Sequence, residues 1–512
     1  MFRQNNLCQT IDKLAINLSL IYVILPIVLF FIGWLRPVLV GGGIVLFEVA
    51  FVAISRSFPK TNAAIVDFKD KDNRNFWFIT LGLVAFWVYL SGIGGFVFQN
   101  GDHWVRNPFF RDLSTYSYPV IYDLSKESDL VQKICGSDKV AFSYYFCWWL
   151  PVSCLSKIFS LSEVTRNILL YLWALLGILL IVYLICRKIG KCTYTIPLIL
   201  ILFSGLDFVP YLLKNNFFAN LPWTNHIEWW AGFPYFQYSS NTTQIFWVFN
   251  QSIPIWLLVA IFLQSPGSKY NAAILSMAFA YSPWATFGVV PYAVADFIRG
   301  KGKFTGKLNL VNIAIPVLLL IVFGSFYLAS SGSNGEKGII FSFHPGEERR
   351  IFCNYLLFIF FEFGIYLFAM GAEAKKYAFY WITAGELLIF PLLVVRDFNF
   401  EMRGSCAALF LLMCYTIRFI NDNKDNSRLK LRNRVLIVAL CIGVMTPLAE
   451  IDRTLQVTTT SDNVLQEQIG SFGNMQTDNA GYIGTAKNQF FVYNYNDTAF
   501  FKYLAHKRSI EP

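Results

Sequence analysis

The chain has 512 residues, of which 55% are apolar and only 14% are charged, and its mean hydropathy is +0.48. This composition excludes a soluble globular protein of this length, which would need a larger charged surface. The net charge of +10 does not indicate a nucleic-acid partner, because the basic residues occur in short loops between apolar segments. The sequence therefore predicts an all-α polytopic membrane protein.

The apolar segments predict the transmembrane helices. A helix needs about 17 to 25 apolar residues to cross a bilayer. The sequence contains ten runs of this kind and a shorter eleventh, at 15–35, 38–54, 76–99, 167–186, 194–213, 243–264, 309–329, 352–370, 377–395, 404–420 and 435–449. We expect about eleven transmembrane helices from these runs.

Two further apolar stretches contain proline and are not expected to make a net crossing. Pro151 interrupts the stretch 140–160, which we expect to lie at the membrane surface as an interfacial helix. Pro283 and Pro291 interrupt the stretch 271–297. This second stretch is expected to form a re-entrant pair of half-helices, which is tolerated where the backbone is buried in protein.

The lysine and arginine residues predict the orientation. They gather in four loops that the positive-inside tendency places in the cytoplasm, namely 55–75, 187–191, 299–307 and 424–434. The N-terminus is then cytoplasmic and the C-terminus extracytoplasmic. The outer face carries the segments 100–139, 214–242, 330–351, 396–403 and 450–512.

This topology divides the chain into three parts. Residues 1–75 form an N-terminal segment with two spans, residues 76–449 form a membrane core with the outer loop 100–139, and residues 450–512 form a short extracytoplasmic C-terminal segment. The cytoplasmic loops are too short for a nucleotide-binding domain, and the chain has no phosphate-binding glycine motif. Both observations argue against chemistry that is fed by ATP or by a nucleotide sugar inside the cell.

A polar cluster follows the third predicted span directly, and it contains Asp102, His103 and Arg106. A carboxylate at the edge of the membrane can accept a proton from a hydroxyl group or bind a divalent cation. Asp102 is therefore the candidate catalytic residue, and His103 and Arg106 are candidate substrate-binding residues. The alternatives are that Asp102 only caps the next helix and that His103 is an interfacial anchor.

A second outer segment combines aromatic rings with hydrogen-bonding side chains, and it contains His226, Glu228 and Trp229. Sugar rings stack on aromatic faces while their hydroxyl groups bind amides and carboxylates. These three residues are candidate substrate-binding residues, and a belt of interfacial tryptophans is the alternative. A metal pair of His226 and Glu228 is not expected, because residues two apart do not share a helix face.

Arginine in two further outer loops predicts contacts to phosphate. Arg396 and Arg403 flank a short loop between spans, and guanidinium groups bind lipid phosphate or pyrophosphate through paired hydrogen bonds. Local neutralisation by Asp397 and Glu401 is the alternative. The second loop is the cluster 344–350, which ends in Arg349 and Arg350 beside the next span. His344 in this cluster is also a candidate substrate-binding residue.

These features resemble the GT-C superfamily of multi-spanning membrane glycosyltransferases. The resemblance lies in Asp102 at the start of a long outer loop, in two predicted interfacial helices at 106–124 and 140–160, and in the many further spans. It implies transfer of a sugar from a polyprenyl-phosphate carrier on the outer face, with Asp102 as the base. The chain departs from the family pattern by having two spans before the one that leads to this loop, where one is usual. It also lacks the paired acidic motif and a large C-terminal domain.

The sequence and this resemblance together predict an integral glycosyltransferase of the bacterial cytoplasmic membrane. Its partners would be a polyprenyl-phosphate-linked sugar, a glycan, lipid or protein acceptor and the membrane lipids, and not a nucleic acid. Arg396 and Arg403 would stabilise the departing phosphate. No cofactor or set of metal ligands is predicted, although a divalent cation stays an open alternative. Two other functions also stay open: a polysaccharide or lipid transporter or polymerase component without this chemistry, and a non-catalytic envelope scaffold.

Overall fold

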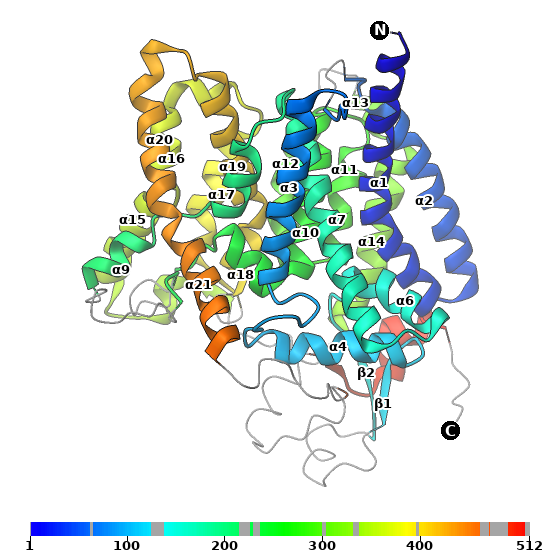
Figure 1. Ribbon diagram of the computed structural model, residues 1–512. Helices are drawn as coiled ribbons and strands as arrows, with labels where there is room; N and C mark the ends of the chain where they lie inside the picture. Colours follow the sequence, from blue (N-terminus) through cyan, green and yellow to red (C-terminus); the bar gives the residue numbers. More distant parts are fainter. Residues whose placement is uncertain are drawn as a thin grey trace.

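The computed structural model describes residues 2–61, 65–123, 138–214, 226–228, 236–299, 304–330, 337–395, 399–460, 471 and 490–506. Most of these residues are helical, and the helices pack side by side in one bundle (Figure 1). Among the described residues, seven helical segments are long and apolar enough to cross a membrane: Cys8–Trp34, Pro37–Ser57, Glu163–Ile189, Asn241–Gln264, Leu310–Leu328, Glu348–Lys376 and Ser427–Thr460. The prediction of an all-α membrane protein is therefore confirmed, whereas the number of eleven crossings stays a prediction.

Four of these segments are α1 (Phe2–Trp34), α2 (Pro37–Ser57), α7 (Glu163–Ile189) and α14 (Leu310–Leu328). The fifth, α10 (Asn241–Gln264), is the centre of the bundle, because 94% of its apolar window is buried inside the protein. The last two are interrupted. One consists of α15 (Glu348–Ile359), the π-helix η5 (Phe360–Gly364), α16 (Ile365–Met370) and η6 (Gly371–Lys376), and the other of η8 (Ser427–Leu429), α20 (Lys430–Gly443) and α21 (Met445–Thr460).

The other predicted spans are shorter or broken. Two of them are single helices, α3 (Lys71–Leu90) and α19 (Cys406–Asp422). The continuous span predicted at 194–213 is wrong, because the chain forms α8 (Thr195–Leu202) and α9 (Phe208–Lys214) with a break at 203–207. The span predicted at 377–395 is helical only in α17 (Tyr380–Ile389), since Pro391 follows it; the chain continues as η7 (Phe390–Leu392) and β4 (Leu393–Val395).

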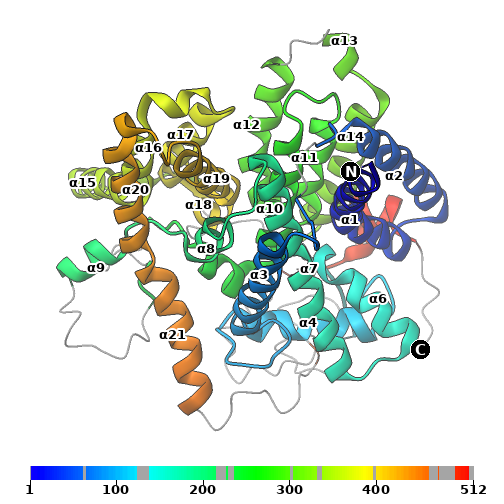
Figure 2. The same cartoon turned by 45° about the horizontal axis from the view of Figure 1, so that its top comes forward.

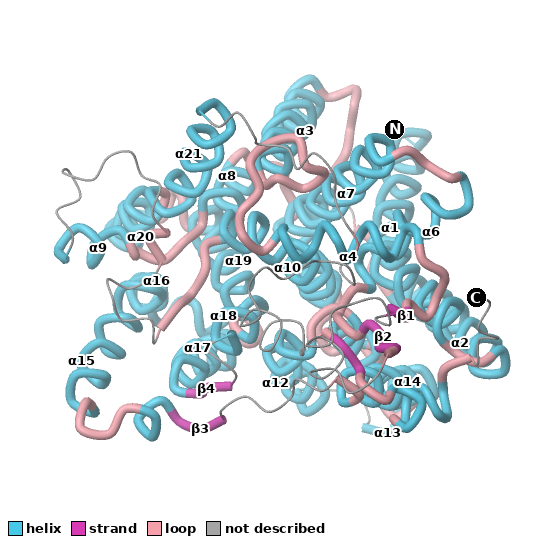
Figure 3. The backbone as a smooth tube through the Cα atoms, turned by 90° about the horizontal axis from the view of Figure 1, so that it is seen from below, coloured by secondary structure: helices cyan, strands magenta, loops and turns pink. Residues whose placement is uncertain are grey.

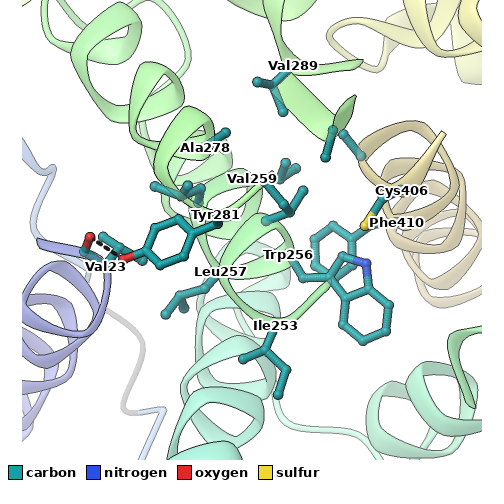
Figure 4. Packing of buried hydrophobic residues seen from close by; sticks show 14 of the residues in the cluster. Val23, Ile253, Trp256, Leu257, Val259, Ala278, Tyr281, Val289, Cys406 and Phe410 are labelled. Atoms are coloured by element: carbon teal, nitrogen blue, oxygen red, sulfur yellow. Dashed lines mark hydrogen bonds between the residues drawn. The ribbon is translucent and has the colours of Figure 1, made fainter. Parts of the chain in front are cut away.

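The stretch 271–297 forms two helices, so the expected interruption is present, whereas the absence of a net crossing stays a prediction. They are α11 (Asn271–Ser276), extended by η3 (Met277–Ala280), and α12 (Pro283–Arg299). The turn between them packs deep in the core, as Figure 4 shows: the hydroxyl of Tyr281 donates to the backbone oxygen of Val23 at 2.7 Å. Trp256 and Leu257 of α10 lie in the same apolar cluster. Burial of this turn satisfies the requirement that non-helical backbone in a membrane be enclosed by protein.

A small antiparallel sheet lies below the bundle in Figure 1, beside short helices. Its strand order is β1 (Ile121–Asp123), β2 (Lys139–Phe142) and β5 (Phe491–Val492), and Ala141 pairs with both Ile121 and Val492. The helices are α4 (His103–Thr115), η1 (Cys147–Trp149), α6 (Leu150–Phe159), η10 (Tyr495–Asp497) and η11 (Phe500–Leu504).

The two interfacial helices predicted for this part of the chain are both shorter than expected. The helix expected at 106–124 ends at Thr115, because Pro119 restricts the residue before it to an extended backbone and the chain then enters β1. The helix expected at 140–160 begins only at residue 147, since the first residues of this stretch pair in the sheet. Helical structure at both places is thus shorter than the sequence predicts.

The remaining elements are α13 (Phe304–Lys307), α18 (Asn399–Gly404) and the pair of β3 (Lys337–Ile339) with β4, followed by η4 (Ile340–Phe343). The two ends of the bundle differ in content. The N-terminus, α13 and the start of α20 lie at the top of Figure 1, whereas α4, α6 and the sheet lie at the bottom. The basic loops and the polar segments predicted to be extracytoplasmic therefore occupy opposite ends.

Candidate functional site

Asp102 occupies the N-cap position of α4, but its side chain makes no capping hydrogen bond. Its Oδ2 instead accepts a hydrogen bond from Nη2 of Arg106 at 2.6 Å, one helical turn further along. The side chain of Asp102 is 40% exposed and that of Arg106 only 4%. The capping alternative is therefore wrong, and the carboxylate is anchored by an ion pair while it stays accessible to a ligand.

Arg403 reaches the same place from α18. Its Nη1 donates to the hydroxyl of Tyr145 at 2.8 Å, and its guanidinium lies 5.9 Å from the centre of that ring. Tyr144 packs against Tyr145 with ring centres 3.9 Å apart. The carboxylate of Asp102 is close enough to act electrostatically on Arg403. Three segments that are remote in sequence thus converge, and they bring three of the predicted site residues together.

Within the described part of the chain, two donors in this group have no hydrogen-bond partner. Nη1 of Arg106 and Nε of Arg403 are buried, and neither makes a hydrogen bond. An unpaired buried donor costs about 1–3 kcal/mol, and more when the group is charged. Both donors belong to guanidinium groups, which bind phosphate and carboxylate oxygens. The arrangement therefore suits an anionic ligand next to the Asp102 carboxylate.

His103 is buried at 1% exposure, and both of its ring nitrogens have neighbours. Nε2 lies 3.2 Å from the backbone oxygen of Phe246 and Nδ1 lies 3.2 Å from the amide nitrogen of Gln99. Burial and the nearby Arg106 charge lower the pKa of His103 to about 4. A neutral ring that donates through Nε2 and accepts through Nδ1 fits both contacts. His103 therefore holds the turn before α4 in place, and its predicted contact with substrate is not supported.

A kink in α10 makes this attachment possible. Val248 has non-helical dihedral angles (φ −134°, ψ 33°), so the regular backbone hydrogen bonds are interrupted there. The backbone oxygen of Phe246 instead accepts a hydrogen bond from Nδ2 of Asn100 at 2.7 Å, and it also lies beside the His103 ring. Below the kink, the ring of Phe249 lies 5.6 Å from the Arg106 guanidinium. The central helix thereby positions both members of the Asp102–Arg106 pair.

A second polar cluster surrounds His226. Its Nδ1 lies 2.8 Å from Oε1 of Glu450 in α21, and its Nε2 lies 3.6 Å from Oε2 of Glu228. His226 and Glu228 belong to a turn rather than a helix, so the helical spacing on which the expectation was based does not apply and the two side chains lie close together. Glu450 also accepts from Trp247 Nε1 at 3.0 Å and pairs with Arg453. Sequence reasoning missed Glu450, because its partner lies 224 residues away.

Burial and the charge of the partner side chain change the pKa values of His226 and Glu228 in opposite directions. Burial raises the pKa of Glu228 to about 7, although the charge of His226 opposes this change. Burial lowers the pKa of His226, but the hydrogen bond to Glu450 and the charge of Glu228 outweigh it, so the net pKa is raised. Glu228 is fully buried, so the protein sequesters the carboxylate that the sequence predicts for sugar binding.

The two clusters are connected through α18. Oε1 of Glu401 accepts from the backbone nitrogen of Gln237 at 2.6 Å, and Nε2 of Gln237 lies 3.3 Å from Nε2 of His226. Glu401 and Arg403 are two residues apart in α18. This short helix therefore contacts the His226 cluster through one side chain and the Asp102 group through another. These contacts do not support the alternative considered above, in which Glu401 neutralises Arg403.

The other predicted site residues lie elsewhere. Trp229 and Arg396 fall outside the described residues. His344 precedes α15, which Figure 3 places far from α4 across the bundle. Within the described ranges, no group of three or more histidine, cysteine, aspartate or glutamate side chains could hold a metal ion. Tyr144 and Tyr145 were not predicted, since nothing in their local sequence signals the approach of Arg403.

We compared the chain with protein-family models, with curated proteins and with solved structures, and none of the three comparisons found a match.

Proposed function

We propose that this protein is an integral-membrane glycosyltransferase of the GT-C kind. It would take a sugar from a polyprenyl-phosphate carrier and transfer it to a hydroxyl group of an envelope glycan, lipid or protein. The observation that supports this proposal is the grouping of an accessible carboxylate with two guanidinium groups. Each guanidinium group has one buried nitrogen that makes no hydrogen bond within the described part of the chain. A base and a phosphate-binding site within one polar group are what this reaction requires.

The chemistry assigns one role to each side chain. The carboxylate of Asp102 accepts the proton of the acceptor hydroxyl, whose oxygen forms a bond to the anomeric carbon of the sugar. The bond between that carbon and the phosphate oxygen breaks, and the electron pair leaves with the phosphate. The growing negative charge meets Nη1 of Arg106 and Nε of Arg403, the two donors without a partner. Arg396 and Trp229 stay candidates for the donor and acceptor sites from the sequence.

The cellular setting belongs to the proposal as well. The basic loops gather at the end of the bundle opposite α4, the helix that Asp102 precedes, and in membrane proteins such loops face the cytoplasm. Asp102 would then work at the outer face of a bacterial cytoplasmic membrane. The membrane itself would supply the lipid-linked donor.

Replacement of Asp102 by Asn tests the catalytic role. Asn retains an oxygen that can accept from Arg106, but it cannot take up a proton, so transfer from purified polyprenyl-phosphate sugars in liposomes should fall by about two to four orders of magnitude. Thermal stability should stay close to that of the wild type. Asp425→Asn, at an exposed residue near the other end of the bundle, serves as the control and should retain full activity. An Asp102→Asn protein with near-normal transfer would end the base hypothesis.

Transport of an envelope lipid or polysaccharide is the second candidate function. It is favoured by helix interruptions that meet inside the bundle, since transporters place binding sites at discontinuous helices. Movement of a fluorescent lipid-linked sugar across the membrane of proteoliposomes, without any change in its glycosyl bond, would support this function over transfer.

A further inference from the structure

A pocket lies at the end of the bundle where the helices α7, α10 and α19 all finish. Figure 2 brings this end of the bundle forward, and α10 packs there against α7 and α19. The pocket is lined by Leu184 and Lys188 of α7, Ala260 of α10, Tyr415 of α19 and Tyr377 in the turn before α17. Its empty volume is about 590 Å³, which includes space open to solvent. No residue of the Asp102 group or the His226 cluster lines it.

The walls of this pocket are apolar and buried, whereas one side of it is exposed. Leu184 and Ala260 are each 1% exposed, and Pro266 at the other extreme is exposed. Lys188 belongs to the last turn of α7, where an apolar span ends. A lysine at the end of a span lies where the acyl chains of a bilayer give way to the headgroups. The pocket is therefore at the level of the lipid headgroups.

Lys188 brings an uncompensated positive charge to the pocket. The residue is half-buried, and its ammonium group makes no hydrogen bond or ion pair within the described ranges. The other two cations nearby are paired: Arg187 contacts Asp12 at 2.7 Å, and Arg418 at the same pocket contacts Asp422 at 3.3 Å. A partly desolvated ammonium group without a counter-charge favours the binding of an anion.

Tyr377 brings a hydrogen-bond donor without an acceptor to the same pocket. Its side chain is 2% exposed, and its hydroxyl is buried without a hydrogen-bond partner in the described part of the chain. The ring is held in place, because it stacks on the Tyr415 ring at 5.5 Å and lies 5.1 Å from the Arg418 guanidinium. The dipole of α7 explains a lysine in its last turn. It does not explain a buried hydroxyl that is left unsatisfied.

We propose that this pocket binds the phosphate group of an anionic membrane lipid. Lys188 pairs with the phosphate and Tyr377 donates a hydrogen bond to it, while Leu184 and Ala260 contact the glycerol and the first part of an acyl chain. The apolar walls favour a lipid over a free phosphate ion, which would leave them without a partner. Anionic lipids are also typical of the leaflet that basic loops face. The site lies at the end of the bundle opposite α4 and does not depend on glycosyl transfer.

Native mass spectrometry of the full chain, delipidated in detergent, tests the proposal with phosphatidylglycerol and phosphatidylcholine as probes. The wild type should bind one phosphatidylglycerol molecule in preference to phosphatidylcholine. Lys188→Gln and Tyr377→Phe should each weaken binding of phosphatidylglycerol about tenfold, because each removes one hydrogen bond to a charged group. Tyr377→Phe retains the stacked ring, so it tests the hydroxyl without disturbing the packing.

Lys191→Gln is the matched control, because Lys191 is exposed at the same end of the bundle and does not line the pocket. It removes the same charge as Lys188→Gln and should leave the affinity for phosphatidylglycerol unchanged. Equal binding of the two lipids by the wild type would overturn the proposal. An equal loss in Lys188→Gln and Lys191→Gln would also overturn it, since this result shows general attraction between the basic end and anionic headgroups.

Inorganic phosphate distinguishes a lipid site from a site for the free ion. Phosphatidylglycerol should raise the melting temperature of the wild type in detergent and should do so less in Lys188→Gln and Tyr377→Phe. Inorganic phosphate should have no such selective effect. If phosphate alone stabilises the wild type more than both variants and displaces phosphatidylglycerol, the pocket is a free-phosphate site and the lipid proposal is wrong.

Discussion

At the scale of single residues, the unfilled donors of Arg106 and Arg403 are the feature most directly related to a ligand. Arg106 is held by Asp102 and Arg403 by Tyr145, so both guanidinium groups are positioned before a ligand arrives. Each nevertheless retains a buried nitrogen without a partner. Positioned donors of this kind lose little conformational freedom on binding, and they therefore favour affinity for an anion.

Replacement of Arg403 by Gln should weaken binding of the lipid-phosphate donor. A charge-assisted hydrogen bond contributes about 1.5–3 kcal/mol, so the KM for the donor should rise about tenfold to a hundredfold. Arg418→Gln is a suitable control, because Arg418 forms an exposed ion pair with Asp422 at 3.3 Å, and exposed pairs contribute little. Steady-state kinetics with purified donor gives both values, and equal KM values in the two variants would remove Arg403 from the donor site.

The raised pKa of Glu228 predicts that the free energy of unfolding depends on pH. Burial raises its pKa from the ordinary value of 4.5 to about 7, so the folded protein holds a proton that the unfolded chain releases. Stability from this group is fully present below pH 4.5 and is lost as the pH rises toward 7. The total change is about 3 kcal/mol. The raised pKa of His226 acts in the same direction, because protonated His226 also stabilises the folded state at low pH.

Glu228→Gln should therefore flatten the decline of the melting temperature between pH 5 and pH 8, as measured by thermal unfolding in detergent. The variant should be less sensitive to pH than the wild type and more stable than it near pH 8. A steeper decline in the variant would show that Glu228 is ionised in the folded protein.

At the scale of elements, the break between α8 and α9 depends on a residue without a side chain. A Cβ atom on Gly205 would overlap the Glu362 carboxyl, and the backbone on both sides of the contact is buried. The break therefore requires glycine for close packing with η5, and the backbone nitrogen of Leu206 donates to the oxygen of Phe361 on that neighbouring helix.

Gly205→Ala should lower stability by about 1–3 kcal/mol, because the added methyl group forces the Glu362 side chain or the backbone to move. Gly385→Ala in α17 is the matched control. A Cβ atom at that position meets nothing within 4 Å, and alanine favours a helix over glycine by about 0.5–1 kcal/mol. Thermal unfolding should thus separate the two variants in opposite directions, and equal stability of both would contradict the close contact at Gly205.

At the scale of the whole molecule, the two ends of the bundle predict opposite accessibility in a cell. Asp425 lies in the basic loop before α20, and Tyr503 is an exposed residue in η11 beside the outer-loop elements. In a background without the exposed Cys353 and Cys441, a cysteine at 503 should react with a membrane-impermeant maleimide in intact cells. A cysteine at 425 should react only after the cells are lysed, and the reverse pattern would invert the proposed topology.

Much of the architecture follows from the sequence because it depends on local composition. Long apolar runs can only be accommodated as buried or lipid-facing helices, so α1, α2, α7, α10 and α14 appear where the sequence predicts them. The basic loops at one end of the bundle are likewise a local signal. Even the turn at Pro283 was predictable, since proline interrupts the helix and directs the chain back into the core.

The site required the tertiary structure. Asp102 could be chosen from the sequence, because a carboxylate at the edge of an apolar run is unusual. Its grouping with Arg403 could not, since 301 positions separate them and only the packing of α18 against the loop after β2 brings them together. His103 looked like a ligand contact and is buried, because the kink at Val248 exposes a backbone oxygen that accepts from it.

The sequence by itself thus determined that the chain is a helical membrane protein, and which loops share an end of the bundle, because hydropathy and charge act on each segment separately. Only the tertiary structure decided that α8 and α9 are separate helices and that the break between them packs against η5. Both outcomes depend on Gly205, where a Cβ atom would overlap the Glu362 carboxyl. Contacts of this kind are set by the shapes of distant surfaces, and the local sequence carries no record of them.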